Sequence, residues 1–388
     1  PDLVYFDGNS LGRLPVATRE RLHAAVEEWA GDLILGWDRW IGLAREAGDL
    51  LAEHVLQARP GEVVLSDSTS VNFYKLAVAA CDARPGRRVL VTDGDNFPTD
   101  QYILAGIARA RGMSVRTVPA DPDTGVATAD VLAALDDDVA LLSLSHVAYG
   151  SGAVADLPAL TAAAHEVGAL TLWDLSHSVG SVPVPLGPAG VDLAVGCTYK
   201  HLNGGPGAPA FLYVRGDLQS QLRQPIWGWF GQRDQFGMAA EYQPADGIDR
   251  FLVGTPGVLG GYAVLEGVRL TAEAGIPAIH AKTRALGEYA VELFDAWLAA
   301  DGMTLASPRD PAVRGAHVSL RHPQAWQLSQ ALRAAGVIPD FRTPDRLRIG
   351  FAPLYTSFAE VHRGFARLRE ILRAGSHRDF AAARGRVT

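Results

Sequence analysis

The stretch Val191-Asp-Leu-Ala-Val-Gly-Cys-Thr-Tyr-Lys200 decides the fold, because it is typical of a buried strand that ends in a cation. A turn rich in glycine and proline, His201-Leu-Asn-Gly-Gly-Pro-Gly-Ala-Pro209, follows it. Upstream, Gly168-Ala-Leu-Thr-Leu-Trp-Asp174 is a second apolar stretch, and it ends in a carboxylate. Ligands of open α/β sheets bind beyond the carboxyl ends of the strands. Asp174 and Lys200 are therefore expected to face one crevice.

An acid and a lysine in this arrangement suit pyridoxal 5′-phosphate (PLP). The amine can form a Schiff base with the cofactor aldehyde, and the acid can pair with the pyridine nitrogen. The alternative is a pair of ordinary strand-end charges, which are common. His177 and Tyr199 lie beside the two residues in sequence, and so many reactive groups at neighbouring strand ends favour a functional site.

Length and composition exclude several classes of protein. A chain of 388 residues predicts two domains. A net charge of −8 argues against nucleic acid or an anionic membrane as a partner. The two cysteines, Cys81 and Cys197, have no metal or disulfide spacing, which predicts a reducing, cytoplasmic setting. No metal site is expected, since His165-Glu166 lacks the second histidine of a zinc helix.

The order of strands and helices predicts an α/β fold in three segments. Apolar strands alternate with helices over residues 56–256, which indicates a large domain with a mostly parallel central sheet covered by helices. Residues 257–388 carry long helices and a few strands and predict a smaller α+β domain. Residues 1–55 form an N-terminal segment, with a helix over 18–30, that we expect to pack with the smaller domain.

Two loops of the large domain are candidate cofactor contacts. Thr69 and Ser70 stand after a short strand and before a helix, where free N–H groups and hydroxyls can bind a phosphate. The alternative is a simple helix N-cap. Asp95-Asn-Phe97-Pro-Thr99-Asp100 follows another strand. Phe97 there is suited to stacking on a cofactor ring and Asp100 to reaching a ring substituent, whereas the alternative is a proline turn.

Two further features suit a substrate pocket. The run Gln224-Pro-Ile-Trp-Gly-Trp229-Phe-Gly has no core periodicity, so it is either a binding wall or a buried loop anchor. Arg348 lies inside an apolar strand pattern and needs an anionic partner. That partner is either a structural carboxylate or the carboxylate of an amino-acid substrate, which an arginine fork binds through two hydrogen bonds.

Taken together, the motifs resemble the kynureninase family, a group of fold-type I PLP enzymes in the aminotransferase superfamily. They run almost from end to end of the chain: Gly8-Asn-Ser-Leu-Gly12, Phe97-Pro-Thr-Asp100, Trp173-Asp-Leu-Ser-His177, Tyr199-Lys-His-Leu-Asn-Gly-Gly-Pro-Gly-Ala-Pro-Ala-Phe-Leu-Tyr213, Gly228-Trp-Phe-Gly231, Gly247-Ile-Asp-Arg-Phe251 and Pro353-Leu-Tyr355. The resemblance implies hydrolysis of the Cβ–Cγ bond of L-kynurenine to anthranilate and L-alanine.

The resemblance also implies a role for each motif residue. Lys200, Tyr199 and Asp174 are the implied catalytic residues. The implied cofactor contacts are Thr69, Ser70, Phe97, Thr99, Asp100, Asp174, His177, Tyr199, Lys200, Trp229 and Thr255. The implied substrate contacts are Arg348, Trp37, Asn9, Ser10, Gly254 and Thr255. Thr255 matches a residue that the family supplies from the neighbouring subunit, which implies a homodimer with shared active sites. Tyr199 is the expected proton-transfer group at the substrate, on the argument that a phenol near a cation can be tuned toward neutral pH.

The substrate is less well defined than the cofactor. Trp37 and the Gly254-Thr255 pair resemble the bacterial type of pocket, which favours L-kynurenine. The chain has Ala148 and Gly150 where the family commonly has Asn and a basic or aromatic residue. A ring-substituted kynurenine, such as 3-hydroxykynurenine or a secondary-metabolism analogue, therefore remains the alternative, together with another fold-type I lyase. A cysteine desulfurase needs a late cysteine, and none follows Cys197. A PLP-binding regulatory module needs a basic DNA-binding segment, and the sequence has none.

Overall fold

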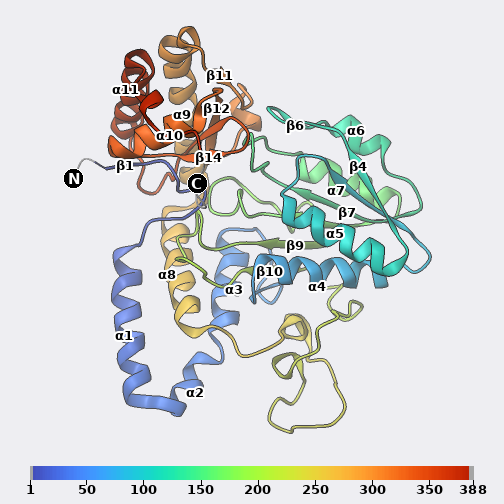
Figure 1. Ribbon diagram of the computed structural model, residues 1–388. Helices are drawn as coiled ribbons and strands as arrows, with labels where there is room; N and C mark the ends of the chain where they lie inside the picture. The colour runs from blue at the N-terminus through green and yellow to red at the C-terminus, as the bar shows by residue number, and fades with distance from the viewer. Residues whose placement is uncertain (1–2, 384–388) are drawn as a thin grey trace.

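The computed structural model describes residues 3–383, and its centre is a seven-stranded sheet (Figure 1). The strand order is β2-β10-β9-β8-β7-β3-β4. The strands span β2 Val63–Leu65, β3 Val89–Asp93, β4 Ser114–Val118, β7 Val139–Ser145, β8 Leu170–Asp174, β9 Leu193–Gly196 and β10 Phe211–Val214. Strands β4, β3, β7, β8 and β9 pair in parallel, and β10 runs antiparallel to β9 and β2. The expected mostly parallel α/β sheet is confirmed.

Helices surround this sheet, as the alternation of strand and helix requires. They span α3 Leu43–His54, α4 Thr69–Asp82, α5 Pro98–Arg111, α6 Thr128–Ala133, α7 Leu157–Glu166 and α8 Val258–Ala274. A short hairpin, β5 Ala120–Asp121 with β6 Gly125–Val126, leads into α6. Helix α4 contacts four of the central strands, which makes it the main cover of the sheet next to the predicted phosphate loop.

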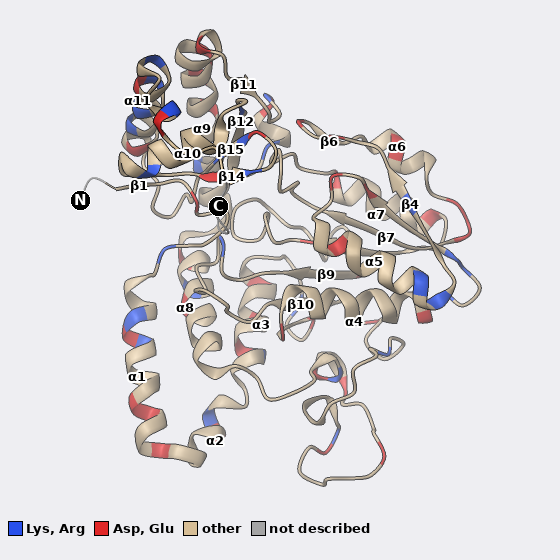
Figure 2. Cartoon of the chain, in the orientation of Figure 1, with Lys and Arg blue, Asp and Glu red and all other residues tan. Residues whose placement is uncertain are grey.

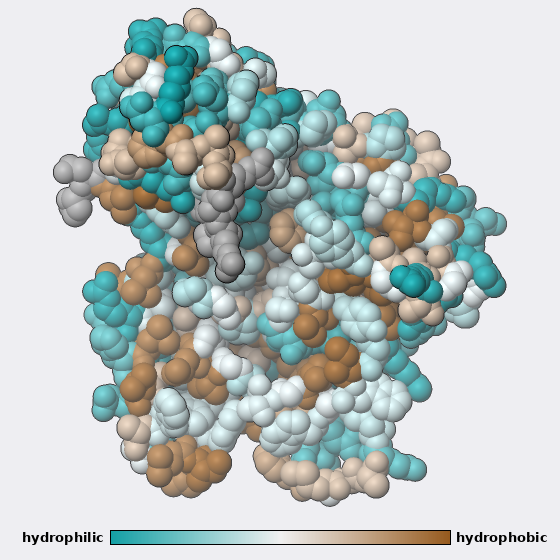
Figure 3. Space-filling model, viewed as in Figure 1, coloured by the Kyte–Doolittle hydropathy of each residue, from teal (hydrophilic) through white to brown (hydrophobic). Residues whose placement is uncertain are grey.

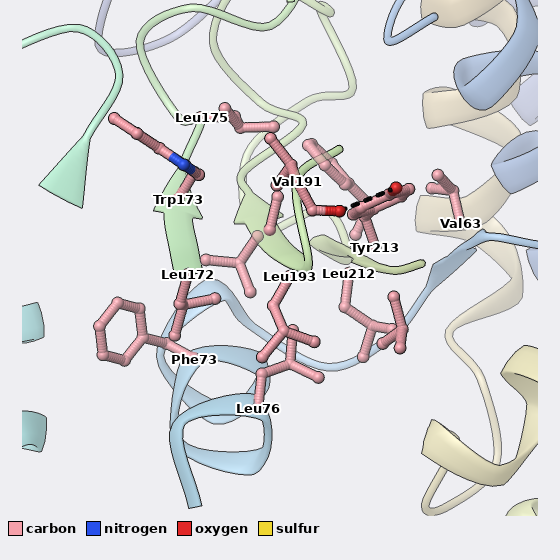
Figure 4. Close-up of a cluster of buried hydrophobic side chains, with 14 of the residues drawn as sticks. Val63, Phe73, Leu76, Leu172, Trp173, Leu175, Val191, Leu193, Leu212 and Tyr213 are labelled. Carbon is pink, nitrogen blue, oxygen red and sulfur yellow. Dashed lines mark hydrogen bonds between the residues drawn. The ribbon is translucent and has the colours of Figure 1, made fainter. Parts of the chain in front are cut away.

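The core between α4 and the sheet is fully apolar. Phe73 and Leu76 of α4 meet Leu172 of β8 and Leu193 of β9 (Figure 4), and all four are inaccessible to solvent. The hydroxyl of Tyr213 donates to the carbonyl of Val191 at 3.2 Å and so satisfies its polar atom inside the core. This packing fixes the carboxyl ends of β8 and β9, where the candidate residues lie.

A second, antiparallel sheet with order β11-β12-β15-β14 forms the centre of a smaller unit. Its strands are β11 Thr304–Leu305, β12 His317–Arg321, β14 Asp340–Arg342 and β15 Arg346–Gly350, and its helices are α9 Ile276–Leu293, α10 Ala325–Ala334 and α11 Phe358–Ala374. These elements enclose a second apolar cluster. Helix α11 begins with a capping box in which Ser357 and Glu360 exchange hydrogen bonds.

The N-terminal segment contacts both units. Strand β1 (Val4–Tyr5) pairs with β13 (Val337–Ile338) of the smaller unit, whereas α3 packs on β2 of the central sheet and α1 (Val16–Asp32) packs along α8. The short helix α2 (Trp37–Trp40) connects α1 to α3. Because α8 and α3 share the large apolar cluster, residues on both sides of the expected boundaries contribute to one core. The boundaries at 55/56 and 256/257 therefore stay a prediction.

Charge and hydropathy are distributed differently over the surface. Basic and acidic side chains both occur along α1 and α11 (Figure 2). Apolar residues gather over the corner between α1 and α2 (Figure 3), where Leu33, Ile34 and Leu35 are 62%, 75% and 71% exposed. Within residues 3–383, none of the helices combines the length and the hydrophobicity needed to cross a membrane.

Candidate active site

A cavity lies at the carboxyl ends of β7, β8 and β9. Its lining residues are Thr69, Ser70, Phe97, Thr99, Asp100, Ser145, Val147, Tyr149, Asp174, Ser176, His177, Tyr199 and Lys200. The structure therefore brings together every residue expected to contact the cofactor except Trp229 and Thr255. The sequence argument missed Ser145, Val147, Tyr149 and Ser176. The strand-end rule already indicated Ser145, since it ends β7 in register with Asp174.

Asp174 is the last residue of β8 and is almost completely buried. One of its oxygens accepts a hydrogen bond from the backbone N–H of Ser176 at 2.7 Å, which fixes the carboxylate. Asp100, near the start of α5, is also buried beside it. Burial and the neighbouring Asp174 raise the pKa of Asp100 well above its usual range. Asp100 therefore holds a proton more readily than an exposed carboxyl group does.

Lys200 lies four residues beyond the end of β9, in the turn rather than in the strand. Its Nζ is 3.0 Å from Nε2 of His177. Burial, with the cations Lys200 and Arg348 nearby, lowers the pKa of His177 well below its usual range, so this imidazole is neutral. The turn is held by the N–H of Gly12, which donates to the carbonyl of Tyr199 at 2.8 Å. The N-terminal motif Gly8-Asn-Ser-Leu-Gly12 thus directly contacts the turn that carries Lys200, the lysine loop.

The N-terminus of α4 forms the opposite end of the cavity. Ser68 is the N-cap and its hydroxyl accepts from the N–H of Val71, so Thr69 and Ser70 are the first helical residues and their N–H groups have no intrahelical acceptor. Behind them, Lys75 is fully buried and donates to Asp67, to Ser66 and to the carbonyl of Phe251, at 2.7, 2.9 and 2.8 Å. Lys75 was missed; a lysine on an otherwise apolar helix face was the available signal.

An aromatic pair closes one side of the cavity. Phe97 packs edge-to-face on Tyr149 with ring centroids 5.4 Å apart. The carbonyl of Tyr149 accepts from Nη1 of Arg348 at 2.6 Å. The aromatic wall is therefore connected to the smaller unit, which supplies Arg348 from β15.

The pKa of Tyr199 differs from what the sequence predicted. Its pKa is raised, because Cys197, burial and the negative charge of Asp174 all disfavour the phenolate. The expectation that a nearby cation tunes this phenol toward neutral pH was therefore wrong for the site as it stands. A protonated Tyr199 can still donate a hydrogen bond or a proton.

Arg348 forms a buried ion pair with Asp340, one of the two alternatives that the sequence left open. Its Nη2 also donates to the hydroxyl of Ser10 at 3.2 Å. Asn9 is fully buried, and its side-chain amide has no hydrogen-bond partner among the described residues. Arg348, Ser10 and Asn9 lie behind the wall formed by Tyr149 and do not line the cavity itself.

The remaining predicted residues lie away from the cavity. Trp37 packs on Phe230, with ring centroids 6.3 Å apart. Trp229 packs on the same phenyl ring and is 41% exposed. Gly254 and Thr255 are exposed as well. Trp229 and Thr255, the latter expected to come from a neighbouring subunit, are thus outside the cavity of their own chain.

The residues present fit PLP. A lysine and a buried carboxylate share one cavity, an aromatic ring lies at its side, and a helix N-terminus with two hydroxyls lies at its end. Among residues 3–383 no cluster of His, Cys, Asp or Glu has an arrangement that could hold a metal ion.

The fold and the cavity define a PLP-dependent enzyme of fold type I. Two solved structures share the architecture at low sequence identity. The apo cysteine desulfurase of Thermococcus onnurineus NA1 has a TM-score of 0.83 and 18% identity, over 96% of this chain and 95% of that one. A C-DES variant with glycine covalently linked to its PLP cofactor has a TM-score of 0.84 and 19% identity, over 95% and 96%. The protein belongs to the kynureninase family: it is 43% identical to the kynureninase of Pseudomonas fluorescens over 379 residues.

That alignment covers 95% of this chain and 89% of the relative. The kynureninase of Deinococcus radiodurans is also 43% identical, over 96% of this chain and 90% of its own length. In addition, residues 279–368 match the family model described as "Kynureninase C-terminal domain". The resemblance seen in the motifs is therefore confirmed at the level of the family.

Proposed function

We propose that this chain binds PLP and hydrolyses the Cβ–Cγ bond of L-kynurenine, giving anthranilate and L-alanine. The observation that carries the proposal is the placement of Lys200 and Asp174 in one cavity of a kynureninase-family chain. When bound, PLP supplies an electron sink for charge that develops at the substrate Cα. The rest of the chemistry depends on how the side chains of this protein bind, orient and exchange protons.

Three parts of the cavity would hold the cofactor. The free N–H groups and hydroxyls of Thr69 and Ser70 suit the phosphate. Phe97 suits the face of the ring. Asp174, fixed by Ser176, suits the ring nitrogen, because a buried carboxylate keeps a nearby base protonated.

Two side chains are placed to move protons. The amine of Lys200 would take the proton from the substrate Cα, with His177 accepting a hydrogen bond from the same nitrogen. Tyr199, kept protonated by its raised pKa, would donate to the ketone oxygen as water adds to the carbonyl carbon. The phenolate would then take a proton from the added water. The re-formed phenol would protonate the departing Cβ and regain its proton from the hydrate hydroxyl, which leaves the carboxylic acid.

Arg348 is the proposed anchor for the substrate carboxylate. Its guanidinium has five N–H donors, and Asp340, Tyr149 and Ser10 hold it in a fixed orientation. Four of these donors are in use: Nε–H and one Nη2–H donate to Asp340, the other Nη2–H to Ser10, and one Nη1–H to Tyr149. The remaining Nη1–H would donate one hydrogen bond to a substrate carboxylate at a preorganised site.

We further propose a cytoplasmic homodimer. Both cysteines are free and buried, which suits a reducing compartment. Trp229 and Thr255, expected at the phosphate, lie outside the cavity of their own chain and are exposed. A second copy that delivered them to the neighbouring cavity would account for both facts and would cover nearby apolar residues such as Phe236, which is 70% exposed.

A substrate panel tests the activity. The purified chain, loaded with PLP, is incubated with L-kynurenine, 3-hydroxykynurenine and other ring-substituted analogues, and L-alanine release is followed by mass spectrometry. We expect alanine from L-kynurenine, and no turnover or cofactor absorbance shift in Lys200→Ala. Retained activity in that variant, or release of alanine from none of the substrates, would contradict the proposal.

A ring-substituted kynurenine is the second candidate, favoured by one observation. Ala148 lines a small cavity next to the main one, and the two cavities share Ser145. At Gly150, by contrast, a Cβ would lie 3.3 Å from Oδ2 of Asp95, which is a tight contact. If kcat/KM in the panel is higher for a substituted substrate than for L-kynurenine, this candidate replaces the first.

A further inference from the structure

Three histidines lie near Lys200, and the proposed mechanism uses only one of them. His177, His201 and His317 are all buried, and their rings and Lys200 interact electrostatically. His177 follows β8 and His201 follows Lys200, but His317 comes from β12 of the smaller sheet. A residue from a different sheet next to the lysine loop is not explained by the cofactor contacts described above.

The contact with Lys200 determines the tautomer of His177. A lysine ammonium has only donors, so Nε2 of His177 must accept at the observed 3.0 Å. The lowered pKa keeps the ring neutral, and its one proton is therefore on Nδ1. That Nδ1 is buried and has no hydrogen-bond partner within residues 3–383, which is unusual for a donor in a folded protein.

His317 presents the complementary group. Its Nε2 is buried without a partner among the described side chains and backbone. Burial lowers the pKa of His317 well below its usual range, so the ring is neutral, and with its proton on Nδ1 the free lone pair is on Nε2. The rings of His177 and His317 have centroids 5.8 Å apart at an angle of 60°. An unsatisfied donor thus lies close to an unsatisfied acceptor.

Gly152 packs closely against that acceptor. Its φ is +76°, and a Cβ at this position would lie 3.2 Å from Nε2 of His317. Both ring nitrogens of His201, the third imidazole, are also buried and without a partner in the described part of the chain. A buried water needs two to four polar partners, and these rings offer that number.

We propose that His317 is a positioning residue for Lys200: through one buried water it accepts the Nδ1–H of His177, and so holds His177 in the tautomer whose Nε2 binds the lysine amine. The charged and titratable groups that face His177 are Lys200, Arg348, His201 and His317. The catalytic consequence rests on the proposed function of Lys200, but the tautomer itself does not.

Nuclear magnetic resonance of the imidazole nitrogens tests this proposal in the cofactor-free protein. The full chain is labelled with ¹⁵N-histidine, and the signals of His177 and His317 are assigned with His177→Gln and His317→Gln. In the wild type we expect His177 to be a neutral Nδ1–H tautomer. In His317→Phe, which removes the acceptor, we expect a mixture of both tautomers, whereas the amide oxygen of His317→Gln should restore the wild-type form. His146→Gln is the matched control, since His146 is another buried histidine but packs on Trp173.

Two results would overturn the proposal: an Nε2–H tautomer of His177 in the wild type, or an unchanged His177 tautomer in folded His317→Phe. If His317→Phe does not fold, the wild-type spectrum and His317→Gln still decide the question. With PLP and L-kynurenine, His317→Phe should lower kcat by roughly 10-fold to 100-fold, the usual effect of losing a group that orients a functional histidine, and leave KM within about twofold. A correct tautomer in a wild type that releases no alanine would contradict the proposed function and not the positioning role.

Discussion

Asp340 and Arg348 form an ion pair in which neither side chain reaches solvent: their exposed fractions are 0% and 1%. Asp340 also pairs with Arg342, so one carboxylate contacts two guanidinium groups. The sequence left two partners open for Arg348, a structural carboxylate and a substrate carboxylate. The geometry shows that the first is present; the second stays a proposal.

Asp340→Asn should destabilise the protein, because the amide keeps the shape and removes the charge that compensates Arg348. Breaking a buried ion pair costs about 3–5 kcal/mol, and urea unfolding should show a loss of about that size. The double variant Asp340→Leu/Arg348→Met should be less destabilised, since it removes both charges. Asp295→Asn is the control: it breaks the exposed pair Asp295–Arg309, and its effect should stay below about 1 kcal/mol.

A pH-dependent loss of stability should trace to Asp93, the last residue of β3. Burial raises the pKa of Asp93 from about 3.8 to about 6. Between pH 4 and pH 6 the carboxyl group of Asp93 is ionised in the unfolded chain but still protonated in the folded protein. Its contribution to the free energy of unfolding is therefore fully present below pH 4 and is lost as the pH rises to 6. The loss is on the order of 3 kcal/mol.

Asp93→Asn tests this, since its amide oxygen can still accept from the N–H of Asp95. We expect the variant to gain stability over the wild type as the pH rises from 4 to 7, in urea titrations at several pH values. Equal pH profiles for the two proteins would show that Asp93 titrates normally.

The sequence predicted most of the cavity because the relevant positions follow from one rule. Phe97, Asp174 and Lys200 each lie at or shortly after the end of a parallel strand, and parallel strands end at the same edge of a sheet. The long helices expected after residue 257 are present, although α9 is regular only to Leu293 and continues as a π turn and a 3₁₀ turn.

Residues brought in by tertiary packing could not be predicted in this way. His317 belongs to the smaller sheet, and no local pattern places it near Lys200. Asp340 lies opposite Arg348 across the β14–β15 hairpin, but only the observed register of that hairpin shows it. The direction of the Tyr199 pKa likewise depends on Cys197 and on burial, which spacing does not report. Trp229 and Thr255 lie outside the cavity because one copy of the chain is an incomplete site under the proposed dimer.

The proposed dimer predicts that substitutions which prevent assembly also weaken the binding of PLP. Ile34→Asp combined with Leu35→Asp places charges on the exposed apolar corner between α1 and α2 (Figure 3). We expect sedimentation to show a mass of 41.3 kDa instead of twice that value, and PLP to bind more weakly because the partner residues are lost. Leu132→Asp on α6, also an exposed leucine, should leave both properties unchanged. A wild-type monomer with full activity would contradict the shared site.

The position of the loop that carries Lys200 should depend on a glycine in helix α8. Gly267 of α8 packs so closely that a Cβ would lie 1.9 Å from the carbonyl oxygen of Leu202, two residues after Lys200. Gly267→Ala must displace either α8 or the loop, and overpacking of this kind costs about 1–3 kcal/mol. Activity should fall as well, because the lysine moves relative to Asp174.

Gly106→Ala in α5 is the matched control for this substitution. Nothing lies within 4 Å of a Cβ at that position, and alanine is favoured over glycine inside a helix by about 0.5–1 kcal/mol. We therefore expect opposite signs: a lower thermal unfolding midpoint for Gly267→Ala and a higher one for Gly106→Ala, with kcat reduced only in the first. If both substitutions are equally harmless, the close contact between α8 and the lysine loop does not exist in solution, and the position of Lys200 must be fixed by the bonds to Gly12 and His177 alone.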